Sequence, residues 1–111
     1  MTVNGFLELV SQSDGVDLDQ LEPMTTLFVQ TRNSHYRLIV ANGDDVLVQG
    51  GSFFPEPTPA WLDGASAGGS LLRRGWIGVG LLMEFRVAGQ RIITSRVLAI
   101  TTERLTSSLV H

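Results

Sequence analysis

The chain has 111 residues, of which 43% are hydrophobic and only 17% are charged, whereas an ordinary soluble domain has about 25% charged residues. All eight basic residues are arginine, and there is no cysteine. These absences exclude disulfides, thiolate metal sites, thiol nucleophiles, the lysine of a phosphate-binding P-loop and lysine Schiff bases. We therefore expect no cofactor.

Charge is distributed unevenly along the chain. Residues 1–22 contain five acidic residues and no basic residue, whereas the remainder contains six acidic residues and eight arginines. The sequence thus predicts an acidic N-terminal arm, 1–22, on a nearly neutral body. Because a duplex-binding surface needs a basic stripe, we do not expect nucleic acid as a partner. The chain also lacks the patterns of a secretion signal and of a membrane span, so we expect a cytoplasmic protein without membrane association.

The acidic arm also carries a signal for the start of a helix. Asp17 precedes Gln20 by three residues, a spacing typical of a helix N-cap. We therefore expect one short helical turn there and no longer helix. We expect a single domain over 1–111, because roughly 110 residues can bury one hydrophobic core.

Beyond Pro23, apolar and polar residues alternate with the period of two that is typical of β-strands. Strands are predicted over 27–31 and from Tyr36, and the second of these ends at a turn. A three-residue turn, Ala41-Asn42-Gly43, would pair Leu38 with Val46 and keep the apolar residues on one face. We predict this register for the hairpin.

The clearest strand is 76–87, in which every odd-numbered residue is apolar. A final strand runs from Arg91 to about Thr102 and has apolar residues on both faces. It is either covered on both sides or shifted in phase by a bulge near Thr94-Ser95. Together these strands predict an all-β fold, a small antiparallel sandwich or partly open barrel of about five to seven strands.

The segment 50–75 differs from the rest because it is rich in proline, glycine and aromatic residues. Pro55, Pro57 and Pro59 favour an extended, stiff conformation. We expect this segment to be a long loop that packs on the sheet, since connections of this length are rare in compact domains unless they are functional or packed.

Six residues are candidates for contact with a partner. Gly78 and Gly80 lie on one face of the predicted 76–87 strand, where two missing side chains would leave a shallow groove. Large aromatic side chains border that groove or come from the long loop. The complete set is Phe53, Phe54, Trp61, Trp76, Gly78 and Gly80.

A second candidate site would bind a small anion. Arg73 and Arg74 precede Gly75, where guanidinium groups and backbone amides could hold a phosphate or a carboxylate. His35 and Glu84 are the other polar groups available to a small-ligand site. Each of these residues also has a simpler interpretation as an ordinary surface residue.

Catalytic chemistry has little support in the sequence. The stretch Gly64-Ala65-Ser66-Ala67-Gly68 matches the G-x-S-x-G pattern of a nucleophile elbow. However, proline-rich sequence precedes it instead of a central strand, so we interpret it as a flexible turn of small residues. With His35 as the only internal histidine and no cysteine, no metal site is expected.

The sequence therefore favours a non-enzymatic module that binds a protein partner or assembles with copies of itself. Low charge and apolar residues on both faces of the last strand support this interpretation. The alternative is a small-ligand site or a minor enzyme that uses Arg73, Arg74, His35 and Glu84.

Overall fold

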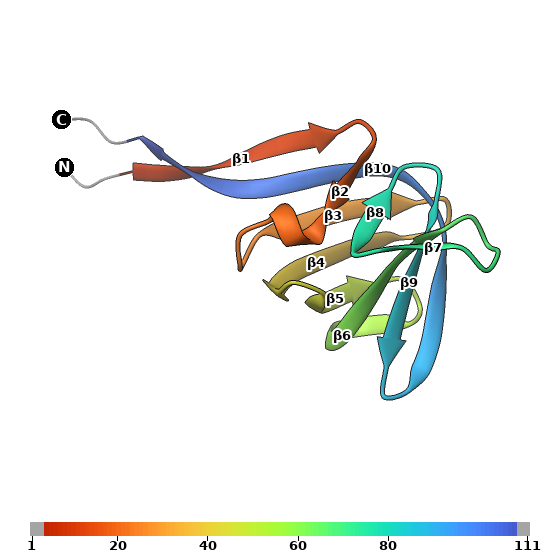
Figure 1. The fold of residues 1–111 in the computed structure, drawn as a ribbon. Helices are drawn as coiled ribbons and strands as arrows, with labels where there is room; N and C mark the ends of the chain where they lie inside the picture. Colours follow the sequence, from red (N-terminus) through yellow and green to blue (C-terminus); the bar gives the residue numbers. More distant parts are fainter. Residues whose placement is uncertain (1–3, 109–111) are drawn as a thin grey trace.

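The fold is built almost entirely of β-strands. The computed structural model describes residues 4–108, and Figure 1 shows a barrel-like body from which a two-stranded ribbon extends. The elements are β1 (Asn4–Gln12), β2 (Gly15–Asp17), the 3-10 turn η1 (Leu18–Gln20), β3 (Thr26–Thr31), β4 (His35–Asn42), β5 (Asp45–Gly50), β6 (Phe54–Ser66), β7 (Leu72–Arg74), β8 (Trp76–Gly78), β9 (Leu82–Val87) and β10 (Gln90–Ser108). The predicted all-β class is confirmed.

Six of the strands close into a barrel. β10 pairs with β3, β3 with β4, β4 with β5, β5 with β6 and β6 with β9, and β9 returns to β10, every pair being antiparallel. The remaining strands are additions to this ring: β1 pairs with β10, β7 pairs with β6, and β2 and β8 form a small second sheet. Of the two predicted architectures the barrel is the one found, and it is closed instead of partly open.

The barrel interior is the hydrophobic core. Side chains alternate between the two faces of a strand, so Leu27 and Val29 of β3 are fully buried while Phe28 between them is exposed. Across the interior, the rings of Phe54 and Phe85 pack edge to face with their centroids 5.5 Å apart. The other buried residues of the core are Val16, Leu18, Tyr36, Leu38, Val40, Val46, Val48, Leu62, Ile77, Met83, Val97 and Ile100.

Strand β10 is 19 residues long and changes neighbours along its length. Its first part pairs with β9, its middle with β3 and its last part with β1. The register with β9 shifts between Ile93 and Arg96, and the register with β3 shifts between Val97 and Ala99. Bulges bend a strand and increase its twist. Of the two alternatives for this strand, the bulge near Thr94-Ser95 is the one found. It lets Ile92 and Val97 both pack in the core, whereas Ile93 and Leu98 stay 40% and 51% exposed.

The β4–β5 hairpin has a different register from the predicted one. Leu38 pairs with Val48 instead of Val46, and the chain turns at Gly43-Asp44. A bulge after Val40 takes up the extra residue. Because the bulge keeps the apolar residues on the inner face, alternation alone could not distinguish the two registers.

The expectation of a long loop over 50–75 is wrong for most of that segment. Its greater part is β6, a barrel strand of 13 residues. In a strand, alternate N–H groups point to the same side, so Pro55, Pro57 and Pro59 remove donors from one edge only. The other edge pairs with β5, and β9 joins β6 only from Trp61 onward. The prolines therefore lie where no strand-to-strand hydrogen bond is lost.

The predicted strand 76–87 is divided in two by a turn. β8 ends at Gly78 and β9 begins at Leu82, and Gly80 between them has a φ of 89°. The two halves belong to different sheets, since β8 pairs with β2 whereas β9 pairs with β6 and β10. The odd-numbered residues are apolar in both halves, so the sequence alone resembles one continuous strand.

The N-terminal arm contains the predicted helical turn and two strands that were not predicted, β1 and β2. Asp17 caps η1, and its carboxylate accepts a hydrogen bond of 3.0 Å from the Asp19 amide. Before it, Asn4–Gln12 form β1, which pairs with the last part of β10. Across residues 4–108, no helix has the length and apolar character needed to cross a membrane.

Tyr36 gives a direct test of the barrel, because it is the only tyrosine of the chain and is buried in the core. Burial raises the pKa of its phenol above 10, and a side-chain hydrogen bond with Ser34 opposes part of this shift. The fold therefore favours the neutral phenol. We expect phenolate absorbance to appear at higher pH in the native chain than in urea, and the free energy of unfolding to fall as pH rises above about 10.

Tyr36→Phe is the control for this titration. The variant should show no phenolate signal and a smaller loss of stability in the same alkaline range. A native chain whose phenol titrates as it does in urea would contradict the buried position of Tyr36.

Candidate functional site

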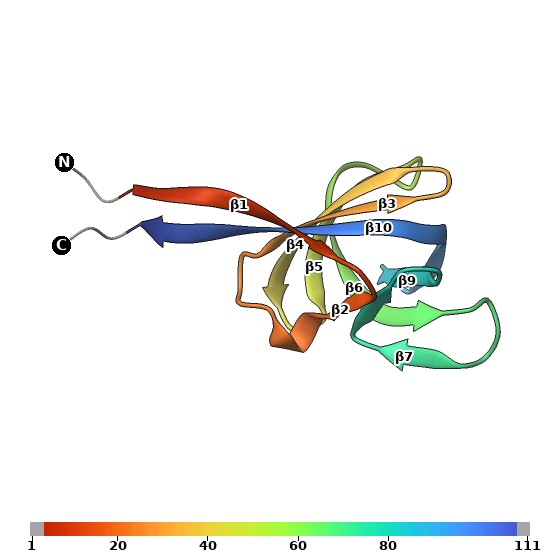
Figure 2. The same cartoon turned by 90° about the horizontal axis from the view of Figure 1, so that it is seen from above.

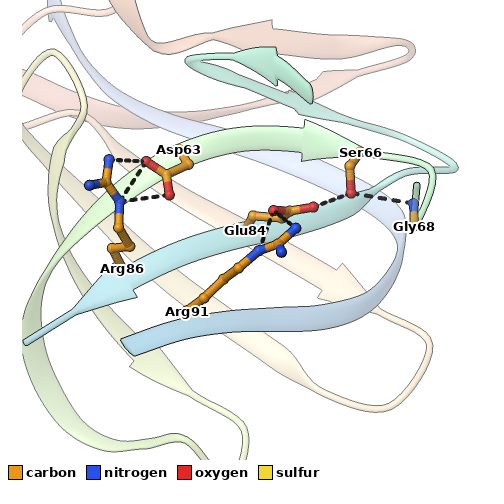
Figure 3. A network of polar contacts seen from close by, with 6 residues as sticks. All are labelled: Asp63, Ser66, Gly68, Glu84, Arg86 and Arg91. Carbon is orange, nitrogen blue, oxygen red and sulfur yellow. Dashed lines mark hydrogen bonds and ion pairs between the residues drawn. The ribbon is translucent and has the colours of Figure 1, made fainter. Parts of the chain in front are cut away.

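A buried polar network joins three adjacent barrel strands near the β6–β7 hairpin, as Figure 3 shows. Ser66 of β6 donates its hydroxyl hydrogen to Glu84 of β9, and the Ser66 oxygen accepts a bond of 3.3 Å from the Gly68 amide. Arg91 of β10 donates to the other Glu84 oxygen from Nε at 3.0 Å and from Nη2 at 2.7 Å. Since Ser66 and Glu84 are both buried, the network fixes the base of the hairpin.

The geometry of this network is structural. Ser66 ends a strand, but the next described element is the short strand β7 and not a helix, so the geometry of a nucleophile elbow is missing. The Ser66 hydroxyl faces a carboxylate that is already paired with an arginine, whereas a serine nucleophile needs a base that is free to accept its proton. The prediction of a flexible turn over 64–68 is wrong for Gly64-Ala65-Ser66, which form the buried end of β6 and pair with both β7 and β9. The turn begins after Ser66, whose hydroxyl is bound to Glu84.

The four residues of the predicted anion site do not form one site. His35 is exposed at the start of β4, and two strands, β5 and β6, separate it from β7, which carries Arg73 and Arg74. Neighbouring strands lie about 4.8 Å apart, so three such steps exceed the reach of a single small anion. Glu84, the fourth residue, is buried and bound to Arg91.

Arg73 and Arg74 act within the chain. The Arg73 guanidinium lies over the Trp76 ring, 3.7 Å from its centroid, which is a cation–π contact. Burial and the charge of Asp19 raise the pKa of the Asp44 carboxyl, and the positive charge of Arg74 lowers it. Of these interactions, the Arg73–Trp76 contact and the attraction between Arg74 and Asp44 are favourable.

The groove predicted over Gly78 and Gly80 does not exist as such, because the Trp76 indole fills the space at Gly78 and Gly80 lies in a turn beyond the strand. Gly78 pairs with Gly15 across the β2–β8 sheet, and a Cβ atom on either glycine would overlap the Trp76 indole. Both glycines are thus needed for the indole to pack. Gly80 lies in the open turn between β8 and β9, and a Cβ atom there would meet nothing within 4 Å.

The candidate aromatic residues of β6 and its preceding turn have different roles. Phe54 is fully buried in the barrel core, whereas Phe53 and Trp61 keep 54% and 39% of their surfaces exposed. Phe53 lies in the turn before β6 and Trp61 lies eight residues further along the chain, a span of at most about 26 Å for an extended strand. They therefore do not share one contact surface.

A shallow cleft lies beside the β6–β7 hairpin and was not singled out from the sequence. It has a volume of about 310 Å³ and is lined by Ala65, Ser66, Ala67, Leu71, Leu72, Arg73 and Leu81. Leu71, in the hairpin loop, is 86% exposed. The cleft was missed because it combines small side chains from a hairpin with Leu81 from a distant turn.

The β1–β10 ribbon, formed by Asn4–Gln12 and Ile100–Ser108, extends beyond the barrel. The two strands pair from Asn4 with Ser108 to Gln12 with Ile100 without a shift of register. Figures 1 and 2 show the ribbon projecting from the body in two perpendicular views, and the molecule measures 52 Å along its longest axis against 28 and 23 Å. The pairing of β10 with β3 ends at Glu103, so within residues 4–108 no third strand joins the outer ribbon.

The edge strands differ in how their unpaired backbone groups are protected. β7 has only three residues and carries two arginines, and the free edge of β6 carries three prolines. Short edges, charges and prolines are devices that proteins use against unwanted strand pairing. The nine residues of β1 include one charged residue, Glu8, and no proline, and Leu9 is 64% exposed. β1 is thus a long edge without these protections.

A hollow of about 290 Å³ lies at the foot of the ribbon, where β1 meets the barrel. Its lining residues are Val10, Gln12, Val16, Gln20, Leu21, Glu22, Thr25 and Thr102. The Thr102 hydroxyl is buried and has no hydrogen-bond partner among the described residues. Buried polar atoms are nearly always paired, so this hydroxyl is an exception within the packed foot of the ribbon.

Comparisons of the chain with protein-family models, with curated proteins and with solved structures gave no match.

The two arginine–carboxylate pairs of the barrel wall provide a matched stability test. The Glu84 side chain is 5% exposed and the Asp63 side chain is 18% exposed, whereas their arginine partners, Arg91 and Arg86, are similarly exposed at 59% and 55%. The two pairs thus differ in the burial of the carboxylate. We expect Glu84→Gln to lower the free energy of unfolding by about 2 kcal/mol, because a buried charged hydrogen bond is lost. Asp63→Asn should cost less than about 1 kcal/mol. Urea denaturation of both variants measures the difference, and equal costs would refute the structural role of the Ser66–Glu84–Arg91 network.

Proposed function

We propose that this protein is a non-enzymatic module that binds a protein partner, or further copies of itself, by adding a strand to β1. The observation that carries this proposal is the long unprotected edge of β1, on a ribbon that extends beyond the barrel. Strand addition to an exposed edge is a recurrent mode of protein recognition, in which main-chain hydrogen bonds supply the affinity.

The limited stability of a two-stranded ribbon supports the proposal. An isolated pair of strands is marginally stable in water, whereas three or more strands with an apolar face are stable. β1 has β10 as its one neighbour, and Leu9 exposes its apolar side chain on this strand. An added strand would pair the free backbone groups of β1 and cover part of this surface.

The alternative anion site has weaker support. Glu84 is committed to Arg91, Arg73 to Trp76, and His35 lies on a strand that is not adjacent to either. The proposed partner is therefore a protein, engaged through backbone groups, and the protein is expected to need no cofactor.

Amide hydrogen exchange of the full chain tests the proposed function. In dilute purified chain we expect the amides of β1 to exchange rapidly, because the ribbon opens at little cost. In the presence of cell extract, the exchange of β1 in the recovered chain should slow by about tenfold or more, while exchange of the barrel strand β4 stays unchanged.

Two variants with the same chemical change serve as controls. Leu9→Arg places a charge on the β1 edge and should abolish the added protection. Leu71→Arg, on the exposed β6–β7 loop, should leave it intact. If β1 exchanges equally fast in dilute solution and in extract, strand addition to β1 is excluded.

A further inference from the structure

We infer that the hollow at the foot of the ribbon binds a small organic cation, in which an ammonium group is carried by an apolar body. The hollow has a volume of about 290 Å³. A water molecule takes about 30 Å³ of the liquid, so a ligand of about ten non-hydrogen atoms would fill this volume. The site lies within one chain and does not depend on a strand added to β1.

The hollow is built by segments that are far apart in the sequence. Val10 and Gln12 come from β1, Val16 from β2 and Thr102 from β10, while η1 and the loop after it complete the wall. Val10, Val16 and Leu21 give it an apolar surface, and the remaining lining residues are polar. Small-molecule sites combine apolar walls with a few polar groups in this way.

The Thr102 hydroxyl is the observation that points to a ligand. Thr102 lines the hollow and is 5% exposed, and its hydroxyl has no hydrogen-bond partner among the described residues. The hydroxyl and the methyl group of a threonine exchange places when χ1 rotates between staggered conformations. The hydroxyl can therefore turn toward the hollow without movement of the backbone. A polar group of a ligand there would supply the hydrogen bond that is missing.

The polar groups around the hollow favour a positively charged ligand. Gln12 and Gln20 contribute amide oxygens, and Glu22 is the one charged residue among the described residues of the lining. The surrounding segment, 14–22, contains four acidic residues and no basic residue. Such a segment attracts cations and repels anions. An ammonium group can donate three hydrogen bonds, so it could bind the Thr102 oxygen and the amide oxygens together.

Three probes that differ in one functional group test the inference. Phenethylammonium, phenethyl alcohol and phenylacetate join the same ring to an ammonium, a hydroxyl and a carboxylate group. In titrations of the full chain at neutral pH, the NMR signals of the Val10, Val16 and Thr102 amides should shift. We expect phenethylammonium to bind with a millimolar or lower dissociation constant, the alcohol to bind more weakly, and the carboxylate to give no saturable shift.

Thr102→Val removes the hydroxyl and keeps the shape of the side chain. The variant should bind phenethylammonium about fivefold more weakly, because a hydrogen bond to the ligand is lost. Without ligand it should be at least as stable as the natural chain, because the unpaired buried hydroxyl is also lost. Urea denaturation measures this second effect and verifies that the variant is folded.

Glu22→Gln tests the contribution of charge. It should weaken the binding of phenethylammonium about two- to threefold, as expected for an exposed carboxylate, and leave the binding of phenethyl alcohol unchanged. Glu56→Gln makes the same chemical change on β6, outside the lining of the hollow. This matched control should bind both probes as the natural chain does.

Three outcomes would overturn the inference. These are a carboxylate probe that binds as tightly as the ammonium probe, a Thr102→Val chain that binds phenethylammonium as tightly as the natural chain, or amides around the hollow that none of the three probes shifts. Each outcome concerns the hollow alone. The hydrogen exchange of β1 decides the proposed function separately.

Discussion

The bend in β10 is the constraint on which the rest of the fold depends. One continuous strand pairs with β9 before the bend and with β3 after it, and these two pairings close the barrel. A straight strand could not serve both neighbours, because they lie on different parts of the wall. The same bend directs the end of β10 away from the body, where it pairs with β1. Barrel and ribbon therefore have a common origin in the bulge at Thr94-Ser95.

Backbone hydrogen bonding explains where the fold ends its sheets. Closure removes edges from most of the barrel. Along the part of β6 that does not pair with β9, the three prolines have no N–H group that could bind another strand. The buried Glu84 network then fixes the point where β6, β9 and β10 meet and β7 branches off. In the part of the chain that the structure describes, β1 is the longest strand edge that faces solvent without a proline or a cluster of charges, and this contrast carries the functional proposal.

The period-two pattern predicted much of the fold because it reports burial directly. It predicted the strands β3, β4 and β5 and the apolar face of the β4–β5 hairpin, and it gave the bulge in β10 as one of two alternatives. It failed at Gly80, where the chain turns but the odd-numbered residues are apolar on both sides of the turn. Two strands of different sheets therefore resemble one strand in the sequence. It also failed at β6, because proline is rare within sheets and the sequence cannot show which edge of a strand is free.

The site was harder to predict because it depends on pairing between distant segments. Phe53 and Phe54 are adjacent in the sequence, yet Phe53 is exposed and Phe54 is in the core. The difference arises because β6 begins at Phe54, and the sequence does not show where this strand begins. Ser66, Glu84 and Arg91 meet because three strands align in one register. β1 was not predicted, since its apolar residues include the adjacent pairs Phe6-Leu7 and Leu9-Val10 and do not alternate.

The ribbon also has a consequence for the order of folding. Gln12 pairs with Ile100 and Asn4 with Ser108, so β1 and its partner are separated by nearly all of the described chain. Contacts this distant in sequence form slowly, because the intervening segment must first become ordered. During synthesis β1 leaves the ribosome long before β10 exists. It therefore spends that interval as an unpaired strand, next to other copies of itself on neighbouring ribosomes.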